Sequence, residues 1–510
     1  MKFISTRGGD KVTGAQAIVK GLAENGGLFV PEKIPQVGKD EMEKLSEMSY
    51  AERAAFLIGK YLADELGEAF LSEACEKAYS AFAGKDPIPL IKVDGQMYIL
   101  ELFQGPTCSV RDISLILLPA LLKKSLEVTG VKEEILLLTA TSGDTGKAAM
   151  EYFRDAAGVK VAVFYPEEGI AKMSRIQLST HAGKNVTVVS VDGSFDDCQR
   201  AVKRMCLSEE FNAQLLEKGV RLSTANSINI ACVLPQIAYY FSAYLDLLTS
   251  GQIEEGEEID FVVTAGNCSA LVAGWYAKNM GLPIRKLVCG SNRNRAVAEF
   301  FKTGAYNAKR ETVRTMSPAL DVAFSTNVER LLFEVSGRNA KLTAERMQQL
   351  ADTKEYSITD KEKAELNKLI FASYGSEDDV VEAMYDVFEE YGYAMDPHTG
   401  VALAAKSVYR YEVEKEDKKD ETAIVVLSTA NPYKFPQDVL YCLSGNDVKD
   451  SFKGVKRLHL LTAMKPPKCL LDIRYKPTRF KLKVKNKVKD MADLVLRFVD
   501  GEVVPEPKED

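Results

Sequence analysis

The stretch ILLLTATSGDTGKAAMEYF, residues 135–153, decides the fold class. Its first six residues form a short apolar run that predicts a buried strand, and the residues after 146 have the spacing of an amphipathic helix. Between strand and helix lie two glycines and four residues with hydroxyl or carboxylate groups. A buried strand, a short polar loop and a helix together form the repeating unit of an α/β protein.

The same unit recurs along the middle of the chain, from Gln96 to about Asn431. Further apolar runs with helical segments between them lie at 159–165, 186–191, 260–264, 285–289 and 423–427. Apolar runs that alternate with helices predict a parallel sheet covered on both faces. The fold class we expect is therefore α/β.

The first ninety or so residues differ, because they have helical spacing at 41–57 and 61–82 and end at the proline-marked segment 87–89. The length of 510 residues is too great for one ordinary core. We expect a helical N-terminal domain (1–92), a core of two interleaved α/β domains (93–450) and a C-terminal extension that packs on the core (451–510).

The charge and composition of the chain argue against a nucleic-acid-binding protein and against a membrane protein. The net charge is −7 and the body of the chain has no cluster of cations, so a nucleic-acid partner is not expected. The N-terminus lacks the pattern of a signal peptide. The longest apolar stretch, 230–248, contains Pro235, Gln236 and Asp246, which predicts a buried helix and no membrane partner.

Cysteine and histidine usage argues against a metal site. The nine cysteines include no C-x-x-C pair, which favours a reducing, cytoplasmic compartment. The three histidines lie far apart in the sequence, so metal catalysis is not expected.

Near the C-terminus, Lys481, Lys483 and Lys485 alternate with apolar residues. This pattern predicts an edge strand protected by lysines, although a membrane or RNA patch gives the same alternation.

Two loops are candidate ligand sites. Residues 141–146 precede a helix, whose free N–H groups and dipole favour an anion such as carboxylate or phosphate. An ordinary helix cap is the alternative reading of this loop. The second loop follows the apolar run FVVT at 261–264, where Gly266 allows a tight turn and the Ser269 hydroxyl with the loop amides can hold a phosphate. Many βα loops look like this one, so the second signal is weak by itself.

Together with several other blocks, these loops resemble the threonine synthase family, in order and over nearly the whole chain. The matching blocks are Ser5-Thr6-Arg7-Gly8, residues 21–31, 100–107, 141–146 and 226–229, Gly290-Ser291-Asn292-Arg293-Asn294, Ser317-Pro318, Ser325-Thr326-Asn327, Asp396-Pro397-His398-Thr399 and residues 427–432. The N-terminal segment and the block at 396–399 disfavour another activity of the same fold type, such as a dehydratase.

The resemblance implies a fold-type II, tryptophan synthase β-like architecture with a pyridoxal 5'-phosphate cleft between two α/β domains. The family converts O-phospho-L-homoserine and water into L-threonine and phosphate, a step of threonine biosynthesis. By the same resemblance the substrate-side residues are Thr141, Ser142, Gly143, Asp144, Thr145 and Gly146. The cofactor-side residues are Gly266, Asn267, Cys268, Ser269, Ala270 and Thr429, the last matching the residue that bonds the pyridine nitrogen.

The chain departs from the family at the residue that bonds the cofactor. The family pattern G-P-T-x-x-F-K-D reads GPTCSVRD at 105–112, so Arg111 takes the place of the lysine. A guanidinium has no deprotonated nitrogen to attack an aldehyde and keeps its proton above about pH 12. Covalent attachment of the cofactor is therefore not expected, and ordinary turnover is doubtful.

Other departures accompany Arg111. Gln104 replaces a histidine, Asn431 replaces another, and residues 266–270 read GNCSA where the family has G-N-F-G-[ND]. We expect these changes to cluster at the cofactor. Lys147 is better read as a solvated or anion-pairing residue than as a substitute lysine. A nucleophilic Cys108 or Cys268 is conceivable but lacks a nearby histidine to activate it, and a buried small side chain is the alternative.

Two hypotheses follow from the sequence. The chain is a threonine synthase, or an altered relative that binds the cofactor noncovalently and acts on an amino acid. Alternatively, it is a non-catalytic paralogue that binds an anionic amino-acid or phosphate ligand, or a partner subunit. A guanidinium pairs well with a planar carboxylate or a phosphate, which favours ligand retention over chemistry. The sequence does not determine the oligomeric state.

Overall fold

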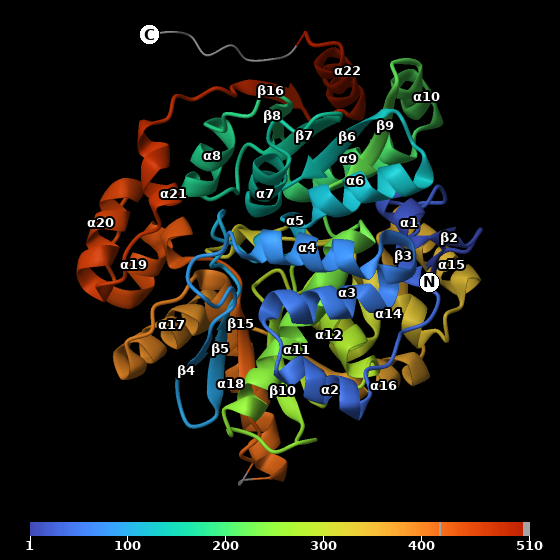
Figure 1. Cartoon of the computed structure of the whole chain (residues 1–510). Helices are drawn as coiled ribbons and strands as arrows, with labels where there is room; N and C mark the ends of the chain where they lie inside the picture. The colour runs from blue at the N-terminus through green and yellow to red at the C-terminus, as the bar shows by residue number, and fades with distance from the viewer. Residues whose placement is uncertain (418–419, 503–510) are drawn as a thin grey trace.

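The computed structural model describes residues 1–417 and 420–502. Two open sheets form its body, one above the other in Figure 1, with helices α3 (Tyr50–Leu66) and α4 (Glu68–Tyr79) crossing in front of them. The N-terminus lies at the right of this view and the C-terminal helices lie at the left and top.

The upper sheet contains five strands in the order β16-β8-β7-β6-β9, and every neighbouring pair is parallel. Its strands β6, β7 and β8 are apolar and almost fully buried, because helices cover both faces. The strands are β6 (Glu134–Ala140), β7 (Val159–Pro166), β8 (Val186–Asp192), β9 (Val220–Thr224) and β16 (Leu482–Lys485). The helices from this part of the chain are α5 (Arg111–Leu115), α6 (Leu118–Thr129), α7 (Asp144–Tyr152), α8 (Lys172–Ser179), α9 (Phe195–Leu207) and α10 (Glu209–Glu217).

The lower sheet contains six strands in the order β14-β11-β10-β15-β5-β4, and only the pairing of β4 with β5 is antiparallel. The strands are β4 (Leu90–Lys92), β5 (Met97–Glu101), β10 (Ile259–Thr264), β11 (Ile284–Ser291), β14 (Ile370–Tyr374) and β15 (Ile424–Ser428). The helices from this part are α11 (Leu234–Thr249), α12 (Ser269–Asn279), α13 (Ala296–Thr303), α14 (Val328–Val335), α15 (Ala340–Thr353), α16 (Asp360–Leu369), α17 (Glu377–Tyr391) and α18 (Pro397–Glu416). A separate antiparallel pair joins β12 (Ala305–Asn307) to β13 (Glu355–Ser357).

The strand predictions for the core are confirmed. All six apolar runs form strands. Five of these strands end within one residue of the predicted C-terminal limit, and β11 continues two residues further, to Ser291. The apolar stretch from residue 230 forms a short 3-10 turn and then α11, and 94% of the apolar window at Ile230–Thr249 is buried. Within the described residues, this is the one segment long and apolar enough to span a membrane.

The N-terminal helix limits are wrong. The predicted helix at 41–57 is two helices, α2 (Lys39–Ser46) and α3, because the Ser49 side chain caps α3 in a capping box with Glu52. The predicted helix at 61–82 breaks at Gly67, which has a φ of 89°. The sequence also failed to predict the small sheet β2-β1-β3 (Val12–Thr13, Lys2–Ser5, Phe29–Pro31) and α1 (Gly14–Lys20).

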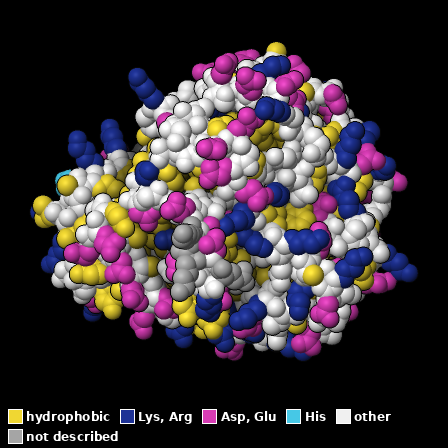
Figure 2. Space-filling view, turned by 90° about the horizontal axis from the view of Figure 1, so that it is seen from below, with side chains coloured by type: hydrophobic (Ala, Val, Ile, Leu, Met, Phe, Trp, Pro, Cys, Tyr) yellow, Lys and Arg dark blue, Asp and Glu magenta, His cyan; other side chains and the backbone are white. Residues whose placement is uncertain are grey.

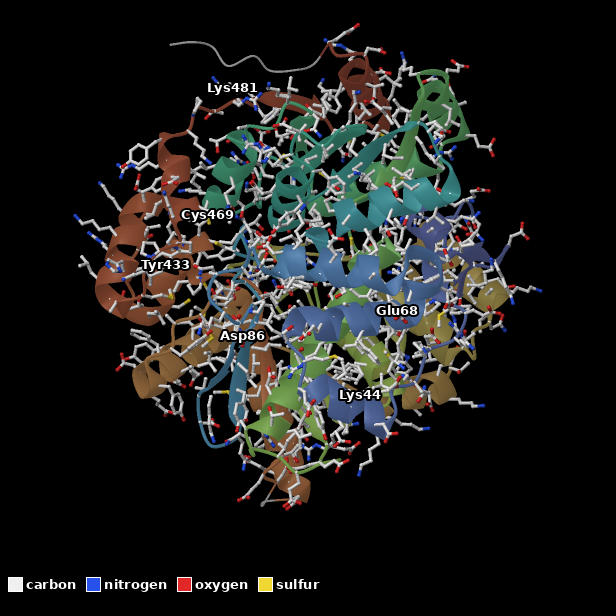
Figure 3. All side chains as sticks on the ribbon, in the orientation of Figure 1. Lys44, Glu68, Asp86, Tyr433, Cys469 and Lys481 are labelled. Atoms are coloured by element: carbon white, nitrogen blue, oxygen red, sulfur yellow. The ribbon has the colours of Figure 1, made fainter. Side chains whose placement is uncertain are left out.

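The C-terminal segment packs along one side of the molecule and returns to the upper sheet. It contains α19 (Pro436–Ser444), α20 (Ser451–Thr462), α21 (Lys468–Leu471), β16 and α22 (Val488–Val499), and the label of Lys481 in Figure 3 marks the approach to β16. As predicted, β16 is an edge strand, and Lys483 forms an ion pair with Glu167. The division at residues 92 and 450 stays a prediction, since β4 and β16 join the core sheets from the outer segments.

The polar loops lie where parallel strands end. Residues 141–146 follow β6, residues 265–268 follow β10, and residues 429–431 follow β15. Ligands of open α/β sheets bind outside the carboxyl ends of the strands. On the face shown in Figure 2, acidic and basic side chains are interspersed, so this face has no broad region of one charge.

A buried carboxylate anchors the N-terminal segment to the core. Glu329, on α14, accepts hydrogen bonds from the Thr6 hydroxyl (2.7 Å) and from the Nε and Nη2 atoms of Arg7 (2.8 and 2.7 Å). Burial raises the pKa of Glu329, but Arg7 and the charge of Lys203 lower it more, so its pKa lies below the ordinary value. The carboxylate is therefore held in its charged form.

We predict that Glu329→Gln lowers the free energy of unfolding by about 3 kcal/mol near pH 7, because it removes one partner of a buried ion pair. The lowered pKa means that this stabilisation is complete above the ordinary carboxyl pKa of about 4.3 and is lost as the pH falls through the folded-state value. Thermal denaturation at several pH values should show the gap between wild type and variant closing on acidification. Glu355→Gln, at an exposed ion pair with Lys309, is the control and should change little.

Candidate functional site

A cavity of about 960 Å³ opens between the two sheets at the strand ends. Its inner part is lined by residues from loops of both sheets, which brings the two candidate loops of the sequence together. These inner residues are Arg111, Ser142, Asp144, Thr145, Gly266, Asn267, Ser269, Ala270, His398 and Thr429. Its outer part is lined by faces of α9 and α15 and by the segment 308–312. The cavity thus has the size and placement of a small-molecule site.

The loop 141–146 divides into residues that build the turn and residues that face the cavity. The Thr141 hydroxyl is buried and accepts hydrogen bonds from the amides of Gly143 (2.9 Å) and Gly146 (3.0 Å). Gly143 has a φ of 136°, and a Cβ there would lie 2.6 Å from the Cβ of Ser174. This tight turn leaves Ser142, Asp144 and Thr145 lining the cavity.

The loop 266–270 presents free backbone amides at the start of α12. The amide of Ser269 donates to the Asn267 side chain (3.0 Å), and the Asn267 carbonyl accepts from Nδ2 of Asn327 (2.9 Å). In the described part of the chain, the amides of Gly266, Asn267 and Ala270 donate no hydrogen bond. Unpaired amides at a helix N-terminus are suited to a phosphate group.

Arg111 is the first residue of α5 and its guanidinium lines the cavity. Among the described residues, the guanidinium has no hydrogen-bond or ion-pair partner, and only the Arg111 amide is bonded, to the Ser109 hydroxyl (3.2 Å). Burial lowers the pKa of Arg111, and the negative charge of Asp144 opposes that shift. An unpaired cation in a partly buried site favours an anionic ligand.

The buried ion pair between Lys434 and Asp144 joins loops of the two sheets. Nζ of Lys434 lies 2.5 Å from Oδ1 of Asp144 and donates to the carbonyl of Thr107 (3.3 Å). The Lys434 side chain is fully buried and does not line the cavity. Burial lowers the pKa of Lys434, but the Asp144 carboxylate raises it more, so its pKa lies above the ordinary value. Lys434 is therefore a charged partner of Asp144 and not a free amine.

The remaining lysines near the cavity do not occupy the position of Arg111. Lys147 forms an ion pair with Glu151 (2.5 Å), as the anion-pairing interpretation predicted. Lys203 and Lys354 line the outer cavity. Burial lowers the pKa of Lys203, against the attraction of Glu329. The inner cavity, in the described residues, is lined by no lysine.

Some predicted site residues do not reach the cavity. Cys268 is buried in the core, where it contacts Cys289, and Cys108 contacts Cys469. Gln104 donates to Glu101 (2.5 Å), and the Asn431 side chain accepts from the amide of Tyr433 (3.0 Å). Gln104, Cys268 and Asn431 are absent from the cavity lining, because Gln104 and Asn431 bond within their own loops and Cys268 packs against Cys289.

Sequence reasoning did not assign roles to three cavity or cleft residues. Lys434 closely follows the block at 427–432, and His398 lies inside a block that matched, so both positions carried a signal. His398 Nδ1 lies 2.7 Å from Oδ1 of Asp396, and its Nε2 accepts from the amide of Ala319 (3.2 Å). Lys203 had no signal, because it is one cation on an amphipathic helix.

Comparison with known proteins identifies the fold and the family. The family described as "Pyridoxal-phosphate dependent enzyme" matches residues 85–429, and the family described as "Threonine synthase N terminus" matches residues 2–79. The fold and site therefore define a fold-type II pyridoxal-phosphate-dependent enzyme architecture. The chain belongs to the threonine synthase family.

Two relatives in sequence and one solved structure carry threonine synthase names. Threonine synthase from Pseudomonas aeruginosa is 34% identical over 441 residues, which cover 86% of this chain and 90% of that protein. Human "Threonine synthase-like 1" is 35% identical over 461 residues, 88% of this chain, but this chain spans only 60% of its length. The crystal structure of pyridoxal-phosphate-bound threonine synthase from Brucella melitensis has a TM-score of 0.83 and 31% identity, covering 98% of this chain and 99% of that one.

Pyridoxal phosphate is the cofactor of this family, and the described residues fit it in part. The unpaired amides of Gly266, Asn267 and Ala270 suit its phosphate, and Thr429 lines the same cavity. The attachment point does not fit, because Arg111 stands at the lysine position and cannot bond the aldehyde carbon.

We predict that Asp144→Asn destabilises the protein by roughly 3–5 kcal/mol, because it leaves the charge of Lys434 buried without a partner. The double variant Asp144→Asn with Lys434→Met should regain much of this loss, since it removes the orphaned charge. Thermal denaturation of wild type, both single variants and the double variant measures the coupling. Losses that simply add would show that the two side chains do not depend on each other.

Proposed function

We propose that this protein binds an anionic amino-acid or phosphate ligand, with pyridoxal phosphate held noncovalently, and lacks the lysine-dependent turnover of threonine synthases. The observation that carries the proposal is the unpaired guanidinium of Arg111 in the inner cavity. A fixed cation at this place binds a carboxylate or phosphate but cannot accept or return a proton near neutral pH.

The residues around Arg111 support an anionic ligand from several sides. Ser142 and Thr145 line the same cavity as Arg111, and their hydroxyls can donate to a carboxylate. The free amides of the 266–270 loop, which lines the same cavity, suit a phosphate, and the family resemblance gives Thr429 the role of bonding the ring nitrogen. When bound, pyridoxal phosphate supplies an electron sink for a carbanion.

Asp144 sets the charge balance of the substrate side. Its carboxylate alone would repel an anionic ligand, but Lys434 neutralises it through the buried ion pair. Its charge also attracts the guanidinium of Arg111. The inner site therefore keeps a net positive character, which suits an anion rather than an amine.

The second candidate function is a residual reaction on O-phospho-L-homoserine, the family substrate. The observation that favours it is the substrate loop, which has the family sequence at 141–146 and lines the cavity through Ser142, Asp144 and Thr145. His398 does not replace the missing base, because both ring nitrogens are already bonded. We place this candidate second for that reason. A reducing cytoplasm and the absence of a nucleic-acid or membrane partner remain expectations.

We predict that wild-type protein binds pyridoxal phosphate reversibly and that Arg111→Lys gains a borohydride-reducible bond to it. The variant restores an amine at the position where the family holds its cofactor, whereas the guanidinium has no free electron pair. Mass spectrometry of reduced, digested protein should find the adduct at residue 111 of the variant only.

Arg204→Lys, which also introduces a lysine into the cavity lining, is the matched control and should gain no adduct. A reduced adduct on any lysine of the wild-type protein, Lys434 or Lys203 included, would contradict noncovalent binding.

We predict that Arg111→Gln weakens binding of O-phospho-L-homoserine by roughly 10–100-fold, because a hydrogen bond to a charged group contributes about 1.5–3 kcal/mol. Isothermal titration calorimetry in the presence of pyridoxal phosphate measures the change. Arg204→Gln, at the outer cavity, should change the affinity much less.

The same samples test turnover. Wild-type protein should release phosphate from O-phospho-L-homoserine no faster than the buffer with free cofactor, and robust release would favour the second candidate over the first.

A further inference from the structure

Two cysteines from distant parts of the chain meet next to each other, one of them in the loop before Arg111. Cys108 lies in the loop that leads to Arg111, and Cys469 lies on α21 of the C-terminal segment. Their sulfur atoms are 3.2 Å apart, and the residues are 361 positions apart in sequence. Cys108 is buried and Cys469 is half-buried. A disulfide bond is about 2.05 Å long, so the sulfurs need to approach by only about 1 Å to form one.

Backbone contacts hold both thiols in place. The carbonyl of Cys108 accepts from the amide of Asn431 (3.1 Å), and Lys434 donates to the carbonyl of Thr107 (3.3 Å). On the other side, the Tyr433 hydroxyl donates to the carbonyl of Met464, which fixes the chain shortly before α21. Figure 3 labels Tyr433 and Cys469 on neighbouring parts of the C-terminal segment. Little rearrangement therefore separates the two thiols from a bond.

The contacts and charges around the pair shift the pKa values of the two thiols in opposite directions. The hydrogen bond from Cys108 lowers the pKa of Cys469, and the positive charges of Lys434 and Lys147 lower it further against the effect of burial. The same contact and burial raise the pKa of Cys108. A more exposed thiolate with a buried thiol beside it is the arrangement of an attacking and a resolving cysteine.

We propose that Cys108 and Cys469 are a site of reversible covalent modification that forms an intramolecular disulfide with hydrogen peroxide as the oxidant. The Cys469 thiolate attacks a peroxide oxygen, the O–O bond breaks, and one water leaves after protonation, so Cys469 becomes a sulfenic acid. The thiol of Cys108 then attacks that sulfur and displaces the hydroxyl group as a second water. Two thiols lose two electrons, and one peroxide is reduced to two waters.

The bond ties the C-terminal segment to the loop before Arg111. Cys108 has a φ of 62° and is followed three residues later by Arg111, so its new bond restrains the backbone that positions the guanidinium. In a reducing compartment the dithiol is the resting form, and peroxide shifts it to the disulfide. This inference does not depend on the proposed function, because its readout is a chemical bond.

The experiment exposes reduced, full-length protein to a small molar excess of hydrogen peroxide, blocks remaining thiols and maps the peptides by mass spectrometry. We expect one peptide pair that joins Cys108 to Cys469, a loss of two thiols per chain, and complete reversal by dithiothreitol. We also expect the oxidised protein to have a higher melting temperature than the reduced form, because the bond constrains the unfolded chain.

The variants Cys108→Ser and Cys469→Ser should each abolish the linked pair, and Cys108→Ser should leave a sulfenic acid on Cys469 that dimedone traps. Cys206→Ser is the matched control, since Cys206 is also half-buried, and it should form the linked pair at the wild-type rate. Wild-type protein that keeps all its thiols, or oxidises Cys469 to a sulfinic acid without the link to Cys108, would overturn the proposal.

Discussion

The buried ion pair between Lys434 and Asp144 is the interaction on which the geometry of the cleft depends. Asp144 begins the helix after β6 of the upper sheet, and Lys434 follows β15 of the lower sheet, so one contact joins the strand ends of both. Lys434 also holds the carbonyl of Thr107, four residues before Arg111. A fully buried charge tolerates little displacement from its partner. The substrate loop and the arginine loop are therefore positioned by the same amine.

Replacement of a lysine by Arg111 leaves this frame intact. The fold depends on apolar strands, caps and the buried charges, none of which needs an amine at position 111. The family likeness accordingly extends over 98% of the chain at a TM-score of 0.83, while the attachment chemistry is missing. The cleft keeps unpaired amides that suit an anion, and a guanidinium lies at position 111, where the motif predicts the lysine of the family. Fold and activity are separable here because they rest on different residues.

The elements that the sequence predicted well are those governed by local pattern. Each of the six predicted strands is a continuous apolar run between polar loops, which is the pattern of a strand buried on both faces. Strands β9 and β14, with the sequences VRLST and IFASY, lack that pattern and were not predicted. The N-terminal helices were misjudged, because Ser49 and Gly67 interrupt a helical pattern that the apolar residues alone continue. Arg111 and the loop at 141–146 were found from motifs. The division of that loop into turn-forming and cavity-lining residues, and the local hydrogen bonds of Gln104 and Asn431, required the structure.

By itself, the sequence determined the α/β class and the family, and it predicted the two ligand loops and the arginine at the position of the family's lysine, because each is encoded in contiguous stretches of residues. Only the tertiary structure decided that Lys434 pairs with Asp144, that Cys108 meets Cys469 and that the Arg111 guanidinium has no partner in the described part of the chain. Those facts join residues up to 361 positions apart. Local pattern carries no information about such contacts, since the packing of two sheets and a returning C-terminal segment brings them together.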